Sequence, residues 1–246
     1  ASTIKPFSAY IPCMENHLIG ENSSRVDKPF KQVNDKDYPS NDYDSYKGQM
    51  SMKDAVAYST NTIPMFLVDE YGVDKTYDWL SKFKLNLDGK NDKTLAALSL
   101  GGLHKGTSVQ SIASMYATLP NRGNYKDAYY YTYVEDSYGD IVIKNDVGKS
   151  TELYSKKTAD SMTNLLSGVV EYGTASEYNV PDGFVGKTGS TNDYHDQWFA
   201  GYNDSITAVV WCGYDKSEAI PVVNETGYKN VAVEIWSKVI NDYLTN

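Results

Sequence analysis

Cysteine and histidine are scarce in this sequence of 246 residues, which contains two cysteines and three histidines. Cys13 and Cys212 are too few to form the disulfide framework of a small secreted domain, and we expect both thiols to be free. His17, His104 and His195 lie far apart and lack the short spacing of metal ligands. The sequence therefore predicts no disulfide scaffold, no metal site and no cofactor.

Long apolar runs and an excess of basic residues are also lacking. No apolar stretch approaches the ~18–20 residues of a membrane-spanning helix. The first ten residues show no basic lead followed by an apolar run, so we expect no signal peptide there. Lysine and arginine number 23 against 32 acidic residues, which gives a net charge of −9. Because a phosphate backbone repels such a chain on average, we expect no nucleic-acid partner.

The overall composition is that of a globular domain with many tyrosines. Hydrophobic residues make up 41%, charged residues 22%, and 22 residues are tyrosine. Such a mixture excludes a disordered tail and a collagen-like rod.

Apolar spacing predicts helices first and an antiparallel sheet near the end of the chain, which is an α+β arrangement. The polar segment His17–Gly48 is expected to be a long surface connection. Ser51 and Asp54 resemble a capping box at the start of a helix that stops around Ser59–Asn61. The other predicted helices are Ser2–Glu15, a helix with Pro64 in its first turn that ends at Tyr71, Asp74–Phe83, Thr107 to about Leu119, Ser155–Glu171 and Tyr228–Leu244.

Strand patterns predict a hairpin and a later three-stranded meander. The hairpin pairs Tyr129–Val134 with Ile141–Lys144, and the meander has tight turns at Thr191–Tyr194 and Asn203–Asp204. We expect residues 1–180 to form a mainly helical part and residues 181–246 a sheet part with a C-terminal helix. The predicted strands of the meander are Gly183–Thr188, Asp196–Tyr202 and Ile206–Tyr214.

One glycine-rich segment, Gly101–Ser108, nearly matches a phosphate-binding loop. It has Thr107 where the lysine of that loop should stand. Without this charge, we expect a plain glycine-rich loop that leads into a helix.

Ser2 and Lys5 form an S-x-x-K motif at the start of the first predicted helix. Residues three apart lie on one helical face, so the amine can reach the hydroxyl. A lysine kept neutral by burial or by a neighbouring cation can accept the serine proton. The same spacing recurs at Ser81 and Lys84 without a companion motif, so the pattern alone is not specific.

Two further motifs follow in order. Ser59 and Asn61 form S-x-N at a break between helices, where serine and asparagine are also common as helix-end residues. Lys187, Thr188 and Gly189 form K-T-G in a predicted strand that runs into a turn. The trio S-x-x-K, S-x-N and K-T-G is typical of serine β-lactamases and penicillin-binding proteins.

The sequence resembles the transpeptidase domain of class A, bifunctional penicillin-binding proteins, which cross-link bacterial peptidoglycan. The resemblance runs essentially from Ser2 to Asp215. Ser190 stands where the family usually has threonine and keeps the hydroxyl and the N–H. The matching blocks are STIKPF (2–7), AVAYSTNTIP (55–64), ASMYATLPNRG (113–123), GVVEYGT (168–174) and DQWFAGY (196–202).

The resemblance implies a catalytic role for five residues. Ser2 would attack the carbonyl of a D-Ala-D-Ala stem peptide to form an acyl-enzyme, and Lys5 would accept its proton. Ser59 would relay a proton toward the leaving D-alanine, and Asn61 would hold the peptide amide of the donor. Lys187 would help keep Lys5 neutral and attract the substrate's carboxylate. An amine of a neighbouring stem peptide would then take the acyl group, while β-lactams would mimic the donor and stay bound.

The resemblance also implies a substrate-binding segment made of Thr188, Gly189, Ser190 and Thr191. The hydroxyls of Thr188 and Ser190 would hold the carboxylate. Backbone N–H groups of Ser2 and Ser190 would form the oxyanion hole, and each such donor is worth about 3–4 kcal/mol of barrier.

The implied fold is the penicillin-binding/serine β-lactamase-like fold, an antiparallel sheet flanked by helices plus an all-helical subdomain. In that fold strands precede the nucleophile helix, whereas only Ala1 precedes Ser2 here. We therefore expect N-terminal strands, packed against the Gly183–Tyr214 sheet, to lie outside this chain. Glycosyltransferase and membrane-anchor segments of the same precursor would also lie upstream, which places the protein at the extracytoplasmic face of the bacterial cell membrane.

Three alternatives remain open. A serine β-lactamase would need a general base for deacylation, and no glutamate lies in a recognisable loop for it. A β-lactam sensor or inactive pseudo-enzyme shares S-x-x-K and K-T-G, so the sequence discriminates it poorly. An N-terminal nucleophile hydrolase needs its nucleophile at residue 1, where Ala1 cannot act.

Overall fold

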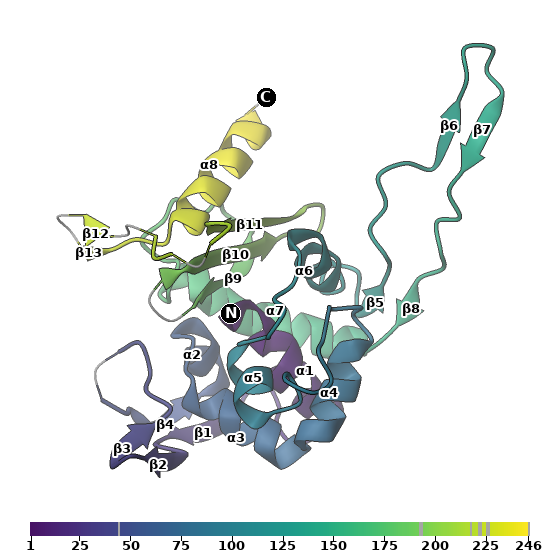
Figure 1. The fold of residues 1–246 in the computed structure, drawn as a ribbon. Helices are drawn as coiled ribbons and strands as arrows, with labels where there is room; N and C mark the ends of the chain where they lie inside the picture. Colours follow the sequence, from purple (N-terminus) through teal and green to yellow (C-terminus); the bar gives the residue numbers. More distant parts are fainter. Residues whose placement is uncertain (44, 192–193, 217, 221–222, 225–226, 246) are drawn as a thin grey trace.

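Helices surround a three-stranded antiparallel sheet in the computed structural model of the chain (Figure 1). The structure describes residues 1–43, 45–191, 194–216, 218–220, 223–224 and 227–245. Helices dominate the first half and the sheet follows near the end, as the α+β prediction requires. The proposed division at residue 180 stays a prediction.

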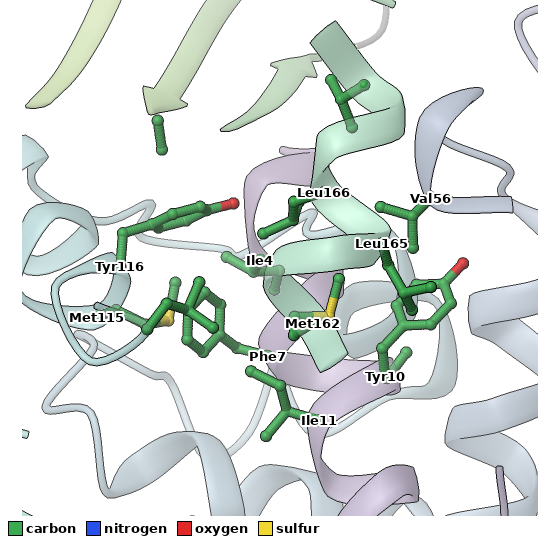
Figure 2. Packing of buried hydrophobic residues seen from close by; sticks show 14 of the residues in the cluster. Ile4, Phe7, Tyr10, Ile11, Val56, Met115, Tyr116, Met162, Leu165 and Leu166 are labelled. Carbon is green, nitrogen blue, oxygen red and sulfur yellow. The ribbon is translucent and has the colours of Figure 1, made fainter. Parts of the chain in front are cut away.

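The first predicted helix is helical throughout but changes its winding. Ser2–Ile4 form a 3₁₀ turn (η1), Pro6–Tyr10 a π-helical turn (η2) and Ile11–Glu15 an α-helix (α1). All residues from Thr3 to Met14 are buried, and Figure 2 shows Ile4, Phe7 and Ile11 pointing into the apolar cluster. The start of the chain is therefore a core element.

The polar segment 17–48 is not the plain connection that we predicted. It contains strands β1 (Ser24–Asp27), β2 (Lys31–Val33) and β3 (Lys36–Tyr38), and it leads into β4 (Gly48–Ser51). β1 pairs with β4 and β2 pairs with β3, both antiparallel. These short strands are mostly exposed, so they lack the apolar alternation that identifies a strand in sequence.

The helices follow the predicted order with one addition. Ser51 caps α2 by accepting the Asp54 N–H at 3.0 Å, which confirms the helix start at Ser51 that the capping-box pattern indicated. A short helix over Leu95–Leu100 (α5) was not predicted, because six mostly apolar residues show no helical period. The remaining helices are α2 (Met52–Ala57), α3 (Thr62–Tyr71), α4 (Val73–Ser81), α6 (Val109–Tyr116), α7 (Lys156–Glu171) and α8 (Val231–Thr245).

The central sheet has the strand order β11-β10-β9. Its strands are β9 (Val185–Ser190), β10 (Asp196–Tyr202) and β11 (Thr207–Gly213), as the meander predicted. Residues 192 and 193 of the predicted turn lie outside the described residues. Helix α8 packs on β10 and β11, with Trp236 in edge contact with Phe199, while α7 and η1 pack against β9 (Figure 1). The K-T-G strand thus lies against the start of the chain.

A two-stranded arm extends from the body (Figure 1). It consists of β6 (Tyr133–Glu135) and β7 (Ile141–Lys144), the predicted hairpin, and is anchored by the pair β5 (Asn124–Tyr125) and β8 (Thr151–Glu152). All residues of β6 and β7 are exposed.

Near the C-terminus, β12 (Val223–Asn224) pairs with β13 (Gly227–Tyr228), so the last helix begins at Val231 rather than at Tyr228. Cys13 is buried, Cys212 is half-buried, and both are free thiols. In the part of the chain that the structure describes, no helix has the length and apolar character needed to span a membrane.

We predict that Phe7→Ala lowers the free energy of unfolding by about 3–5 kcal/mol, the usual cost of removing a buried phenyl group. Phe7 is fully buried and lies in edge contact with the rings of Phe83 and Tyr116. Urea denaturation followed by circular dichroism measures the change. Tyr138→Ala is the control, because Tyr138 is 90% exposed on the arm and should change stability by less than about 0.5 kcal/mol. A loss below about 1 kcal/mol for Phe7→Ala would contradict this packing.

Candidate active site

Three segments that are distant in sequence meet beside one cavity. Ser2 comes from η1, Ser59 from the break between α2 and α3, and Thr188 from β9. The cavity has a volume of about 430 Å³. It is lined by Ser2, Asp42, Ser59, Tyr172, Gly173, Thr174, Ser176, Glu177, Tyr178, Thr188, Gly189, Ser190 and Asn230.

The break between α2 and α3 places Ser59 at the centre of the site. Ser59 has φ 55°, in the left-handed region, and the N–H of Thr60 still bonds to the Ala55 carbonyl at 3.0 Å. The next helix starts at Thr62, so Ser59, Thr60 and Asn61 lie outside both helices. Their carbonyls are therefore available to other groups.

Lys5 reaches this break from inside the core. Its Nζ donates to the carbonyls of Ser59 and Thr60, each at 2.9 Å, and to Asn61 Oδ1 at 2.6 Å. None of these three bonds goes to Ser2. Burial lowers the pKa of Lys5 from 10.5 to about 7, and the charge of Asp42 opposes that shift. Burial is thus the main cause of the lowered pKa at the lysine of S-x-x-K.

Lys187 approaches the same serine from the sheet. Its Nζ donates to Ser59 Oγ at 2.7 Å and to the Thr188 carbonyl at 3.0 Å. The side chain is 1% exposed, and burial, followed by the charge of Lys5, holds its pKa well below 10.5. Ser59 therefore connects the two amines, one through its carbonyl and one through its hydroxyl.

Gly189 allows β9 to lie directly against η1. A Cβ at this position would lie 3.0 Å from Thr3 Cγ2 and 3.2 Å from Ala1 Cβ, which is tighter than ordinary packing. The absence of a side chain at Gly189 permits this close approach at the strand edge. Next to it, the hydroxyl groups of Thr188 and Thr174 are 2.7 Å apart and form a hydrogen bond.

Most of the predicted site residues come together. Ser2, Ser59, Thr188, Gly189 and Ser190 line the cavity. Lys5, Asn61 and Lys187 join it through the hydrogen bonds described above. Thr191 is separate: it lines two neighbouring cavities, and its hydroxyl accepts the Asp196 N–H at 2.8 Å.

Several cavity residues have no signature in the three motifs. Thr174 lies in the block GVVEYGT, so the resemblance alone pointed to it. Asp42, Glu177 and Asn230 belong to polar segments and carry no pattern that marks a site. In the described part of the chain, no three His, Cys, Asp or Glu side chains are grouped to hold a metal ion.

The two competing patterns do not line this cavity. Ser81 is exposed and donates to the Asp78 carbonyl at 2.7 Å, while Lys84 forms an exposed ion pair with Asp127. The glycine-rich segment ends at Ser108, which caps α6 by accepting the Ser111 N–H at 3.0 Å. Neither region lines the cavity that Ser2 and Ser59 share. The glycine-rich segment nevertheless begins next to it, because the Gly101 carbonyl accepts a hydrogen bond from the Ala1 amino group at 2.5 Å.

Comparisons with known proteins agree with these motifs. Residues 1–229 match the family described as Penicillin binding protein transpeptidase domain. Penicillin-binding protein 1F of Bacillus subtilis is 33% identical over 230 residues, which cover 88% of this chain and 30% of that protein. Penicillin-binding protein 1A of Clostridium botulinum is 29% identical over 254 residues, all of this chain and again 30% of the relative. The chain thus spans about 30% of the length of these relatives.

Among solved structures, penicillin-binding protein 1A of Haemophilus influenzae superposes with a TM-score of 0.82 at 19% identity, over 100% of this chain and 42% of that chain. At this identity the likeness shows the fold alone. It confirms the predicted penicillin-binding fold class.

We predict that the Lys5 amine titrates with a pKa near 7 rather than 10.5. The measurement is ¹³Cε NMR of labelled lysine, with Lys5→Met to assign the signal. Between about pH 7 and pH 10.5, Lys5 is protonated in the unfolded chain and neutral in the native chain. The free energy of unfolding should therefore rise with pH across this range. Lys5→Met should reduce that rise between pH 7 and pH 9. A Lys5 titration near pH 10.5 would contradict the buried site.

Proposed function

The chain belongs to the transpeptidase-domain family of penicillin-binding proteins, and from this premise we propose that it is a serine D,D-transpeptidase. It would cross-link peptidoglycan stem peptides through an acyl-enzyme on Ser2. The observation that supports this most directly is the meeting of two buried lysines at Ser59, in the wall of the cavity that Ser2 lines. Buried amines are the bases that such a serine requires, because at neutral pH they can lose their protons.

Acylation would begin at Ser2. Neutral Lys5 keeps only two N–H groups for its three oxygen contacts, which leaves a lone pair on Nζ. That lone pair, one helical turn away, would take the proton of the Ser2 hydroxyl as Oγ forms a bond to the carbonyl carbon of the penultimate D-alanine. The bond to the terminal D-alanine nitrogen then breaks, and Ser59 passes a proton to that leaving amine. The Lys187–Ser59 hydrogen bond of 2.7 Å supports this relay, since it links the hydroxyl to a second amine.

Substrate binding would use the sheet edge. The terminal carboxylate of the donor would lie at the hydroxyls of Thr188 and Ser190, and its negative charge would raise the pKa of Lys187 and restore a cation there. Asn61 would hold the donor amide, and the N–H groups of Ser2 and Ser190 would form the oxyanion hole. Gly189 and Thr191 complete the proposed substrate-binding segment, Thr191 at its outer end.

The nitrogen of an amine on a second stem peptide would then bond to the acyl carbon as the Ser2 Oγ–carbon bond breaks. The amine gives up a proton to Ser59 and Lys187, and Lys5 returns its proton to Oγ, which regenerates Ser2. β-Lactams would acylate the same serine and leave slowly. We further propose that the natural protein carries glycosyltransferase and membrane-anchor segments upstream, and that it acts at the extracytoplasmic face of the bacterial cell membrane. The chain's 30% share of its relatives' length is compatible with such segments.

We predict that a penicillin adds its mass to the protein and that Ser2→Ala abolishes the adduct, because the acylated oxygen is then absent. Intact-mass spectrometry measures the adduct. Ser81→Ala is the matched control, since it removes the serine of the other S-x-x-K pattern and should leave the adduct unchanged. An adduct that persists in Ser2→Ala, or none in the intact protein, would refute the assignment.

Exchange of a D-amino acid on a thioester donor separates a transpeptidase from a β-lactam sensor. The transpeptidase should turn over repeatedly, whereas a sensor should only be trapped as an acyl-enzyme.

A further inference from the structure

Asp27, the last residue of β1, is a buried carboxylate that the proposed chemistry does not use. It is 1% exposed and accepts four hydrogen bonds. The donors are Thr62 Oγ1 at 2.5 Å, Tyr43 OH at 2.7 Å, Asn41 Nδ2 at 2.9 Å and the Lys47 N–H at 2.9 Å. Burial opposes the charged form, but these donors together hold the pKa of Asp27 below 3.8, so it remains an anion.

The bonds of Asp27 lead to Asn61 from two sides. A carboxylate only accepts, so Asn41 must present its NH₂ to Asp27 and its carbonyl to the other side. That carbonyl accepts the Asn61 N–H at 2.7 Å. On the other side, Asp27 binds the hydroxyl of Thr62, the residue that follows Asn61.

The side-chain amide of Asn61 is oriented by the same loop. Its Nδ2 donates to the Ser40 carbonyl at 2.7 Å, which leaves Oδ1 to accept from Lys5 Nζ at 2.6 Å. Ser40 directly precedes Asn41, so Asp27 also holds the segment that binds this amide. The chain of contacts runs from a buried anion, through Asn41, to an oxygen on the S-x-x-K lysine.

We propose that Asp27 is a positioning residue for the reaction: through Asn41 and Thr62 it holds Asn61 with its carbonyl oxygen on Lys5. Asp27 does not line the cavity, so its effect is transmitted by hydrogen bonds. The predicted change in acylation rate rests on the proposed function, whereas the orientation of Asn61 toward Lys5 does not.

The charged and titratable groups near Lys5 are few. Lys187 faces it from β9, Asp42 from the loop before β4, and the Ala1 amino group from the start of the chain. Asn61 Oδ1 is a neutral acceptor that favours the ammonium form. If it moves away, the pKa of Lys5 should fall, so acylation should begin at a lower pH.

The test uses Asp27→Asn and Asn41→Ala, with Asp37→Asn as the matched control. Asp37 is exposed on β3 and bonds only weakly to Gln32 at 3.3 Å, so its change leaves Asn61 untouched. We expect both test variants to slow acylation by a penicillin by about 10- to 100-fold at the optimum pH. The acid limb of their pH–rate profile should shift to lower pH, in the same direction as in Asn61→Ala, and the control should behave as wild type.

The pH profile separates positioning from stability. If Asp27→Asn and Asn41→Ala keep the wild-type acid limb, whether or not they melt earlier or react more slowly, Asp27 has only a structural role and the inference is wrong. If Asp27→Asn does not fold, Asn41→Ala decides the outcome by itself.

If the wild-type protein is not acylated, the proposed function fails instead, and ¹³Cε titration of Lys5 replaces the measurement of the acylation rate. A lowered Lys5 pKa in Asn41→Ala then supports the positioning role, and an unchanged one overturns it.

Discussion

The burial of two amines without a carboxylate bonded to either is the constraint on which this structure depends. Lys5 and Lys187 donate only to carbonyl, hydroxyl and amide oxygens among the described residues. An ammonium group in such surroundings is costly, and the chain relieves that cost by favouring the neutral amine. Both amines stay buried only while η1 packs against β9 and Ser59 lies between the two lysines. The absence of a side chain at Gly189 makes the first of these contacts possible.

Asp27 is a carboxylate as little exposed to solvent as the two lysines. Four donors hold its pKa below 3.8, whereas burial dominates at Lys5 and lowers the pKa of that amine. The lowered pKa values favour charge at Asp27 and the neutral form at the two amines. Through Asn41 and Asn61, the carboxylate of Asp27 and the amine of Lys5 belong to one hydrogen-bonded system.

Sequence reasoning predicted those parts of this arrangement that depend on the type and spacing of side chains. Helical spacing, the Ser51 cap and the strands of the meander could be read directly, and the three motifs named the residues that meet. The strands between Ser24 and Tyr38 could not, because their exposed polar residues show no alternation. Nor could Asp27, since a buried aspartate in a polar segment looks like any surface aspartate. Its importance arises from contacts with residues 14 to 35 positions away.

The middle residue of S-x-N shows what a sequence motif leaves out. Lys5 Nζ donates to three oxygens of this segment, and one of them is the main-chain carbonyl of Thr60. Every amino acid has a main-chain carbonyl oxygen, so the identity of residue 60 does not predict this contact. The side chain of Thr60 is fully buried, so the residue at this position must fit the space around it. Its hydrogen bond with Lys5 depends instead on where the main chain places the carbonyl group.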